Sequence, residues 1–249
     1  MVAAVAAVTS GCGGAADLQT SRNFQQAEQA FADAARPEDF LRVAGLYQEI
    51  LDRGFVSGTV LFNQGNAWMR AGQRGRAIAA YRQAQRWKPR DPYLDANLNN
   101  ALASNATDST RSSPMDYILF WQDWLSYREK FLLTTITLGF TLLLGIVSRL
   151  LPQPRLWKRL GLACLAWTLL TGISTARDWY RYDFVMHGVV VQSETIARKG
   201  NSQNYEPAFT SALRDGTEFE VRERRGDWLR IHVAQAGEGW IPAHAATTY

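Results

Sequence analysis

Residues 60–90 read VLFNQGNAWMRAGQRGRAIAAYRQAQRWKPR, a stretch in which small and aromatic residues recur at helical spacing. The small residues Gly65 and Ala77 would allow two helices to approach each other closely. The aromatic residues Trp68 and Tyr81 would then fill the space that remains between these helices. The stretch therefore predicts a pair of tightly packed helices.

Glycine and proline mark the ends of these two helices. Gly72 would turn the chain between them, and Pro89 cannot continue the second helix. Seven positions share the spacing of the tetratricopeptide repeat, namely Gly65, Trp68, Gly72, Ala77, Tyr81, Ala84 and Pro89. The stretch thus resembles a tetratricopeptide repeat, and arrays of such repeats bind peptides or protein surfaces.

Similar patterns lie on both sides of this repeat. Residues 24–52 resemble a diverged copy, with apolar residues at helical spacing on either side of a short polar turn. Residues 92–102 place a leucine at every fourth position, which predicts one more amphipathic helix that caps the stack. The sequence therefore predicts an all-α helical-repeat domain over residues 20–102.

A basic segment lies inside this domain, because seven basic residues and no acidic residue occur between Arg70 and Arg90. The candidates for contact with an acidic partner or an anionic membrane surface are Arg70, Arg74, Arg82 and Arg86. The alternative is a solvated helix face whose counter-charges lie elsewhere on the surface. The sequence leaves both interpretations open.

Two apolar runs follow a small, polar linker at 103–115. Residues 131–147 and 160–174 contain no charged side chain. A spanning helix needs about 20 mainly apolar residues, and flanking apolar residues extend both runs toward that length. The sequence predicts a membrane region over 116–176, with two transmembrane helices and an aromatic interfacial helix ahead of them. The alternative for the aromatic segment is a soluble core helix.

The loop between the two runs sets the expected orientation. Residues 148–159 carry four basic residues and no acidic one. Loops of this kind stay in the cytoplasm. We therefore expect the loop to be cytoplasmic and both soluble domains to lie outside the cytoplasmic membrane of a bacterium.

Residues 1–19 resemble an export or lipoprotein segment, because a short apolar run precedes small residues and Cys12. Cys12 would then be a candidate for lipidation. No basic residue precedes the apolar run, which a start upstream of Met1 would explain. A frayed terminus of small residues is the alternative.

Residues 185–249 have a different sequence pattern, with short β-prone runs separated by turn residues. Four or five strands in so short a segment predict a small all-β barrel. The segment resembles bacterial SH3-like domains at Arg198, Gly200, Gly216, Trp228, Gly239 and Trp240. Trp228 and Trp240 could form a ligand platform, but we expect them to have a structural role in the core.

Motifs for catalysis are absent from the sequence. The two cysteines and three histidines form no cluster with metal-ligand spacing. The chain has no phosphate-binding glycine loop, no nucleophile elbow and no zinc-protease signature. The formal net charge of +4 is mild and predicts no nucleic-acid partner. We therefore expect a protein that is not an enzyme and has no catalytic residue, cofactor or metal.

The order of these segments resembles the E-type members of the Bacteroides aerotolerance (Bat) operon family. The resemblance implies a role in the cell envelope beside membrane proteins with von Willebrand A-type domains and a MoxR-type ATPase. We expect a membrane-anchored scaffold whose repeats bind proteins and whose barrel binds protein or cell wall. The alternative is a peptidoglycan-binding accessory that positions a separate cell-wall hydrolase.

Overall fold

The structure is a computed structural model that describes residues 13–103, 122, 124–150, 154–234 and 236–249. Cys12, most of the expected linker and most of the expected interfacial helix lie outside these residues. The described residues form seven α-helices, one short 3-10 helix and a small set of antiparallel strands. The predicted combination of helices, two long apolar helices and a small sheet is confirmed.

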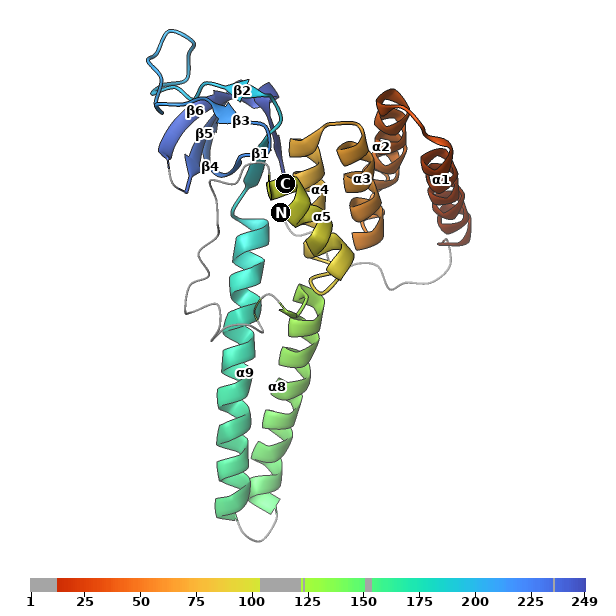
Figure 1. Cartoon of the computed structure of the whole chain (residues 1–249). Coiled ribbons are helices and arrows are strands. Elements are labelled where there is room, and N and C mark those ends of the chain that lie inside the picture. Colours follow the sequence, from red (N-terminus) through yellow and green to blue (C-terminus); the bar gives the residue numbers. More distant parts are fainter. Residues whose placement is uncertain (1–12, 104–121, 123, 151–153, 235) are drawn as a thin grey trace.

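Five helices form a stack in the N-terminal part, and each packs against the next (Figure 1). They are α1 (Gly13–Asp33), α2 (Pro37–Asp52), α3 (Gly58–Arg70), α4 (Arg74–Gln85) and α5 (Pro92–Ala103). Helix α1 begins within the segment expected to be an export signal. The core contains two apolar clusters, one centred on Tyr47 between α1, α2 and α3, and one centred on Tyr81 between α3, α4 and α5.

The turn and the close helix contact expected between α3 and α4 are both present. Gly72 has a φ of 74°, a conformation that glycine adopts without strain. A Cβ at Gly65 would lie 2.4 Å from the ring of Tyr81, so only glycine fits at this crossing. Ser57 caps α3 by accepting a hydrogen bond from the backbone N–H of Val60.

Helices α8 (Tyr127–Leu150) and α9 (Pro154–Asp183) lie side by side and extend away from the rest of the molecule (Figure 1). Both are long and apolar enough to cross a membrane. Helix α8 has 24 residues, and at about 1.5 Å per residue it exceeds the ~30 Å hydrocarbon core. Helix α9 continues beyond residue 176, where the sequence placed the end of the membrane region.

The C-terminal part is a curved antiparallel sheet in the strand order β6-β5-β4-β1-β7. The strands are β1 (His187–Val190), β4 (Glu218–Arg225), β5 (Trp228–Val233), β6 (Gly237–Pro242) and β7 (Ala246–Thr248). A second sheet pairs β2 (Glu194–Thr195) with β3 (Leu213–Arg214), and the 3-10 helix η1 (Ala243–Ala245) precedes β7. The core of this C-terminal part consists of seven buried residues, among them Phe219, Leu229, Ile231 and Ile241.

Candidate functional site

The sheet docks on helix α4, which sequence analysis did not anticipate. Val189 of β1 is fully buried in the same cluster as Ala77, Ile78 and Tyr81 of the helical stack. Tyr249, which follows β7, packs against this cluster. The helical stack and the sheet therefore meet through an apolar contact at Val189 and Tyr249, while the sheet also has a core of its own.

An ion pair lies at the edge of this apolar contact. Arg82 of α4 donates from Nε to one oxygen of Glu218 at 2.7 Å and from Nη2 to the other at 2.9 Å. Burial by itself would lower the pKa of Arg82, but the hydrogen bonds and the charge of Glu218 outweigh burial and raise it. The pair thus links α4 to β4 with fixed bidentate geometry.

The N-terminus of α4 makes a second contact with the sheet. Gln73, at the N-cap position, gives no side-chain cap, and the backbone N–H of Gly75 instead donates to the carboxylate of Asp215 at 3.0 Å. Arg74 donates to the backbone oxygen of Asp215 at 2.9 Å. Burial raises the pKa of the Asp215 carboxyl, although the hydrogen bond from Gly75 acts in the opposite direction. The carboxylate serves as the missing cap of α4.

The four candidate arginines of the basic segment contact other parts of the same chain. Arg74 and Arg82 bind the sheet of the same chain. Arg86 lies 3.6 Å from Asp183 and over the ring of Tyr182, at the end of α9. Arg70 lies over Phe31 and Phe40 within the helical stack. Arg82 and Arg86 thus face carboxylates of the same chain, whereas Arg70 lies over aromatic rings. Binding of an external partner by these arginines stays a prediction.

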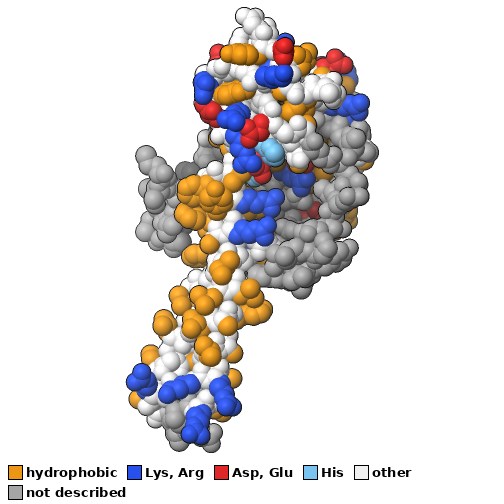
Figure 2. Space-filling model, turned by 90° about the vertical axis from the view of Figure 1, so that its left-hand side faces the viewer, with side chains coloured by type: hydrophobic (Ala, Val, Ile, Leu, Met, Phe, Trp, Pro, Cys, Tyr) orange, Lys and Arg blue, Asp and Glu red, His pale blue; other side chains and the backbone are white. Residues whose placement is uncertain are grey.

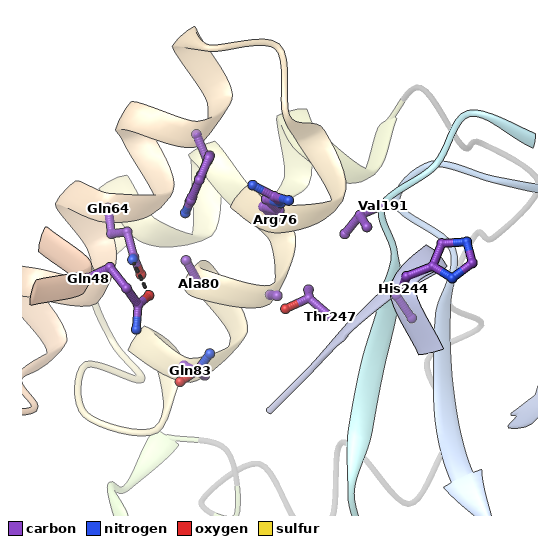
Figure 3. A pocket seen from close by; sticks show the side chains of 11 residues that line it. Gln48, Gln64, Arg76, Ala80, Gln83, Val191, His244 and Thr247 are labelled. Carbon is purple, nitrogen blue, oxygen red and sulfur yellow. Dashed lines mark hydrogen bonds between the residues drawn. The ribbon is translucent and has the colours of Figure 1, made fainter. Parts of the chain in front are cut away.

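A cavity of about 280 Å³ lies between the helices and the sheet, and we call it the inter-domain groove (Figure 3). Its helical wall is formed by Gln48, Gln64, Trp68, Arg76, Ala79, Ala80 and Gln83. Its sheet wall is formed by Val191, His244, Ala246 and Thr247. No aspartate or glutamate is among these described lining residues, and three glutamines are among their polar side chains.

Two side-chain contacts order the helical wall. Gln64, only 4% exposed, donates to the side chain of Gln48 at 2.8 Å, and the two point toward each other in Figure 3. The guanidinium of Arg76 lies 4.8 Å from the ring centre of Trp68. This cation–π contact holds the Arg76 side chain along the groove. The wall is therefore polar and ordered before any ligand binds.

The residues that resemble SH3-like domains lie outside this groove. Trp240 is 9% exposed, and Trp228 at the start of β5 is half-buried. Arg198 exchanges two backbone hydrogen bonds with Trp240, each 2.8 Å long. A Cβ at Gly200 would lie 2.6 Å from the Tyr205 ring, and one at Gly239 would lie 3.0 Å from Ala197. Gly216 has a φ of 85° where the chain passes Ile78 of α4.

The hairpin contains a buried ion pair that sequence analysis missed. Lys130 of α8 is 2% exposed at its side chain and lies 2.5 Å from Asp178 of α9. Lys130 also donates to the backbone oxygen of Gln122, whose amide donates to Asp178 at 2.8 Å. The sequence contained one signal for this pair, because Lys130 precedes the first apolar run and Asp178 follows the second. Such groups are costly to bury, so they fix how α8 and α9 pair.

The described residues contain one free thiol and no cluster of metal-ligating side chains. Among them, no group of three or more His, Cys, Asp or Glu side chains could hold a metal ion. Cys164 is a free thiol on α9, 3.6 Å from the backbone oxygen of Thr137 on α8. The inter-domain groove is thus equipped for binding through hydrogen bonds and one cation.

No protein-family model matches the chain, and no curated protein and no solved structure matches it either.

Proposed function

We propose that this protein is a membrane-anchored scaffold of the bacterial cell envelope, with no enzymatic activity of its own. In this proposal the helical stack is a tetratricopeptide-repeat domain and the sheet is an SH3-like barrel. The repeat assignment is supported by the close contacts and turn geometry of five motif residues, which fit their positions in the repeat. They are Gly65, Trp68, Gly72, Ala77 and Tyr81. The pairing of Arg198 with Trp240 is compatible with the barrel assignment.

The observation that carries the proposal is the inter-domain groove. It is lined by both soluble parts, which are joined by Arg82 and Glu218. The stack is also tied to the hairpin, because Arg90 pairs with Glu129 and lies over Trp124. A binding surface held at a fixed position above a membrane anchor is suited to recruiting another protein to that membrane.

The orientation of the anchor is part of the proposal. Lysine and arginine side chains gather at the free end of the hairpin, beyond an apolar middle part (Figure 2). The described basic residues near this end are Arg149, Arg155, Lys158 and Arg159. Positive charge favours the cytoplasmic side, so the groove would face the exterior. The expected partners are envelope proteins, including von Willebrand A-type membrane proteins acting with a MoxR-type ATPase.

A pair of reporter fusions tests the orientation. An enzyme that is active only outside the cytoplasm should be inactive when fused after Pro154 and active when fused after Tyr249. The opposite pattern would overturn the proposed location of the groove.

Co-purification and sedimentation test the scaffold role. The full chain, extracted in mild detergent, should co-purify with a co-expressed von Willebrand A-type membrane protein. Sedimentation of the chain with isolated peptidoglycan is measured in parallel. Sedimentation without co-purification would instead favour the peptidoglycan-binding accessory.

A further inference from the structure

Strand β7 forms one edge of the sheet. It pairs with β1 on one side, and no other strand of the described residues pairs with its opposite side. Edge strands expose unpaired backbone groups that can accept a further strand. Most proteins shield such an edge from pairing with another chain. We therefore ask which ligand the edge beside the groove would bind.

The hydrogen-bond pattern shows which groups of β7 point outward. In an antiparallel pair, alternate residues bond to the partner strand, and the others point away from it. Ala245 accepts from Val191 and Tyr249 exchanges two bonds with His187, so these residues face β1. Ala246 and Thr248 must therefore direct their backbone groups away from β1.

Ala246 has a local partner for one of these groups, because its N–H donates to Ala243. The other outward-facing groups are the carbonyl oxygen of Ala246 and the N–H and carbonyl oxygen of Thr248. No hydrogen bond to these three groups occurs among the described residues. The outward edge of β7 therefore offers one donor and two acceptors.

The inter-domain groove reaches the first part of this edge. Ala246 and Thr247 form part of its sheet wall, and the glutamines of the helical wall lie across from them (Figure 3). From Arg76 to Gln83, α4 covers about 10 Å, and three strand residues cover about the same length. A strand added to β7 would thus lie between β7 and the glutamine side chains.

The charge of the residues that line the groove indicates which kind of ligand it would bind. Arg76 is the one arginine among the described residues that line the groove, and none of these lining residues is acidic. Its described contact is the cation–π interaction with Trp68, and no ion pair of Arg76 occurs among the described residues. A guanidinium held in this way is suited to bind a carboxylate of a ligand.

We propose that β7 accepts an extended, glutamate- or aspartate-bearing peptide segment of a partner protein as an added strand. The backbone of the segment pairs with Thr248 and Ala246, and one of its carboxylates binds Arg76. The side chain of Gln83 faces the opposite edge of the segment and supplies a hydrogen bond there. This inference rests on the proposed function, because it identifies what the scaffold binds.

Peptide binding to the full chain in detergent tests the proposal. The probe is a fluorescent pool of end-capped peptides of about seven residues, composed of threonine, valine and glutamate in random order. One comparison pool has lysine in place of glutamate, and another carries a methyl group on every backbone nitrogen. We expect the glutamate pool to bind, as measured by fluorescence anisotropy, and both comparison pools to bind at least about tenfold more weakly.

Two variants locate the binding site. Thr248→Pro removes the outward N–H but leaves the pairing with β1, because proline is tolerated on an edge strand. It should raise the dissociation constant about threefold to tenfold, whereas the control Thr248→Val should leave it unchanged. Arg76→Gln should raise it about tenfold or more, and Arg22→Gln on the exposed face of α1 should have no effect. Thermal unfolding midpoints should agree among all four variants.

Failure of this inference is distinguishable from failure of the proposed function. Absence of binding by the glutamate pool, binding of the methylated pool, or equal affinities of Thr248→Pro and Thr248→Val would each overturn strand addition. Intact co-purification of the membrane partner in any of these cases would leave the scaffold role unaffected. Loss of co-purification by the unaltered chain, with its peptide binding intact, would overturn the scaffold role instead.

Discussion

Arg82 and Glu218 lie 136 residues apart in sequence and form a bidentate pair with N–O distances of 2.7 and 2.9 Å. The pair joins helix α4 to strand β4 beside the buried side chain of Val189. The helical stack and the sheet are therefore held together by an ion pair as well as by apolar contact. Separating residues 185–249 from the chain would expose Val189 and Tyr249 to water.

Replacing Glu218 should weaken the docking of the sheet on α4. Glu218→Gln keeps the shape of the side chain but removes the charge that Arg82 faces. Both side chains are about one-third exposed, so we expect a loss of about 1–2 kcal/mol in the free energy of unfolding. Thermal unfolding of the full chain in detergent measures this loss. Glu223→Gln, which removes a partner of Arg225 within the sheet, should cost less than about 0.5 kcal/mol.

Adding a methyl group at Gly75 should separate the sheet from α4. A Cβ at this position would lie 2.2 Å from the carbonyl oxygen of Val190 and 2.5 Å from Asp215. Gly75→Ala should therefore destabilise the protein, although alanine favours helices by about 1 kcal/mol over glycine. Gly45→Ala is the matched control, because a Cβ there has no atom within 4 Å.

The two glycine variants should thus change the unfolding midpoint in opposite directions. Hydrogen exchange would locate the effect of Gly75→Ala, with faster exchange at β1 and at the start of α4. A rise in the midpoint for both variants would contradict the close contact between Gly75 and Val190.

The glycine contacts also show what the sequence could and could not predict. Gly65 and Gly72 act within one pair of neighbouring helices, so local spacing was sufficient to find them. The burial of Val189 depends on a helix that lies more than 100 residues earlier in the chain. A single sequence contains no periodic signal for such a contact. The partners of Arg74 and Arg82 were hidden for the same reason.

The pair of apolar helices α8 and α9 allows a different kind of prediction. Lys130→Met would leave the carboxylate of Asp178 buried without its cation, which should cost about 3–5 kcal/mol. The double variant Lys130→Met with Asp178→Leu removes both charges and should be more stable than either single variant. Unfolding by dodecyl sulfate, followed by helical circular dichroism, measures these differences.

Lys158→Met at the free end of the hairpin is the control, because that side chain is exposed and its loss should have little effect. A double variant that is less stable than both single variants would show that the two charges do not act as a pair.

His187 predicts how stability changes with pH. Burial, assisted by the charge of Arg181, lowers the pKa of His187 below its usual 6.5. The folded state therefore binds a proton less readily than the unfolded state, and stability is lost as the pH falls below about 6.5. His187→Gln should reduce the loss of stability between about pH 7.5 and pH 5.5. His232→Gln on β5 is the control, and an equal reduction in both variants would exclude His187 as the source.

Trp240 should stabilise the sheet and not serve as a ligand platform. Its side chain is 9% exposed, its backbone pairs twice with Arg198, and the guanidinium of Arg225 covers its ring at 5.2 Å. Trp240→Ala should cost about 3–5 kcal/mol, because it removes a large buried aromatic side chain. Trp228→Ala should cost less, since Trp228 is only half-buried. Hydrogen exchange in the full chain should then accelerate throughout β5 and β6 for Trp240→Ala. Unchanged exchange together with weaker binding of a ligand would assign Trp240 to a binding surface, because a residue that only contacts ligand leaves the stability of its strands unaltered.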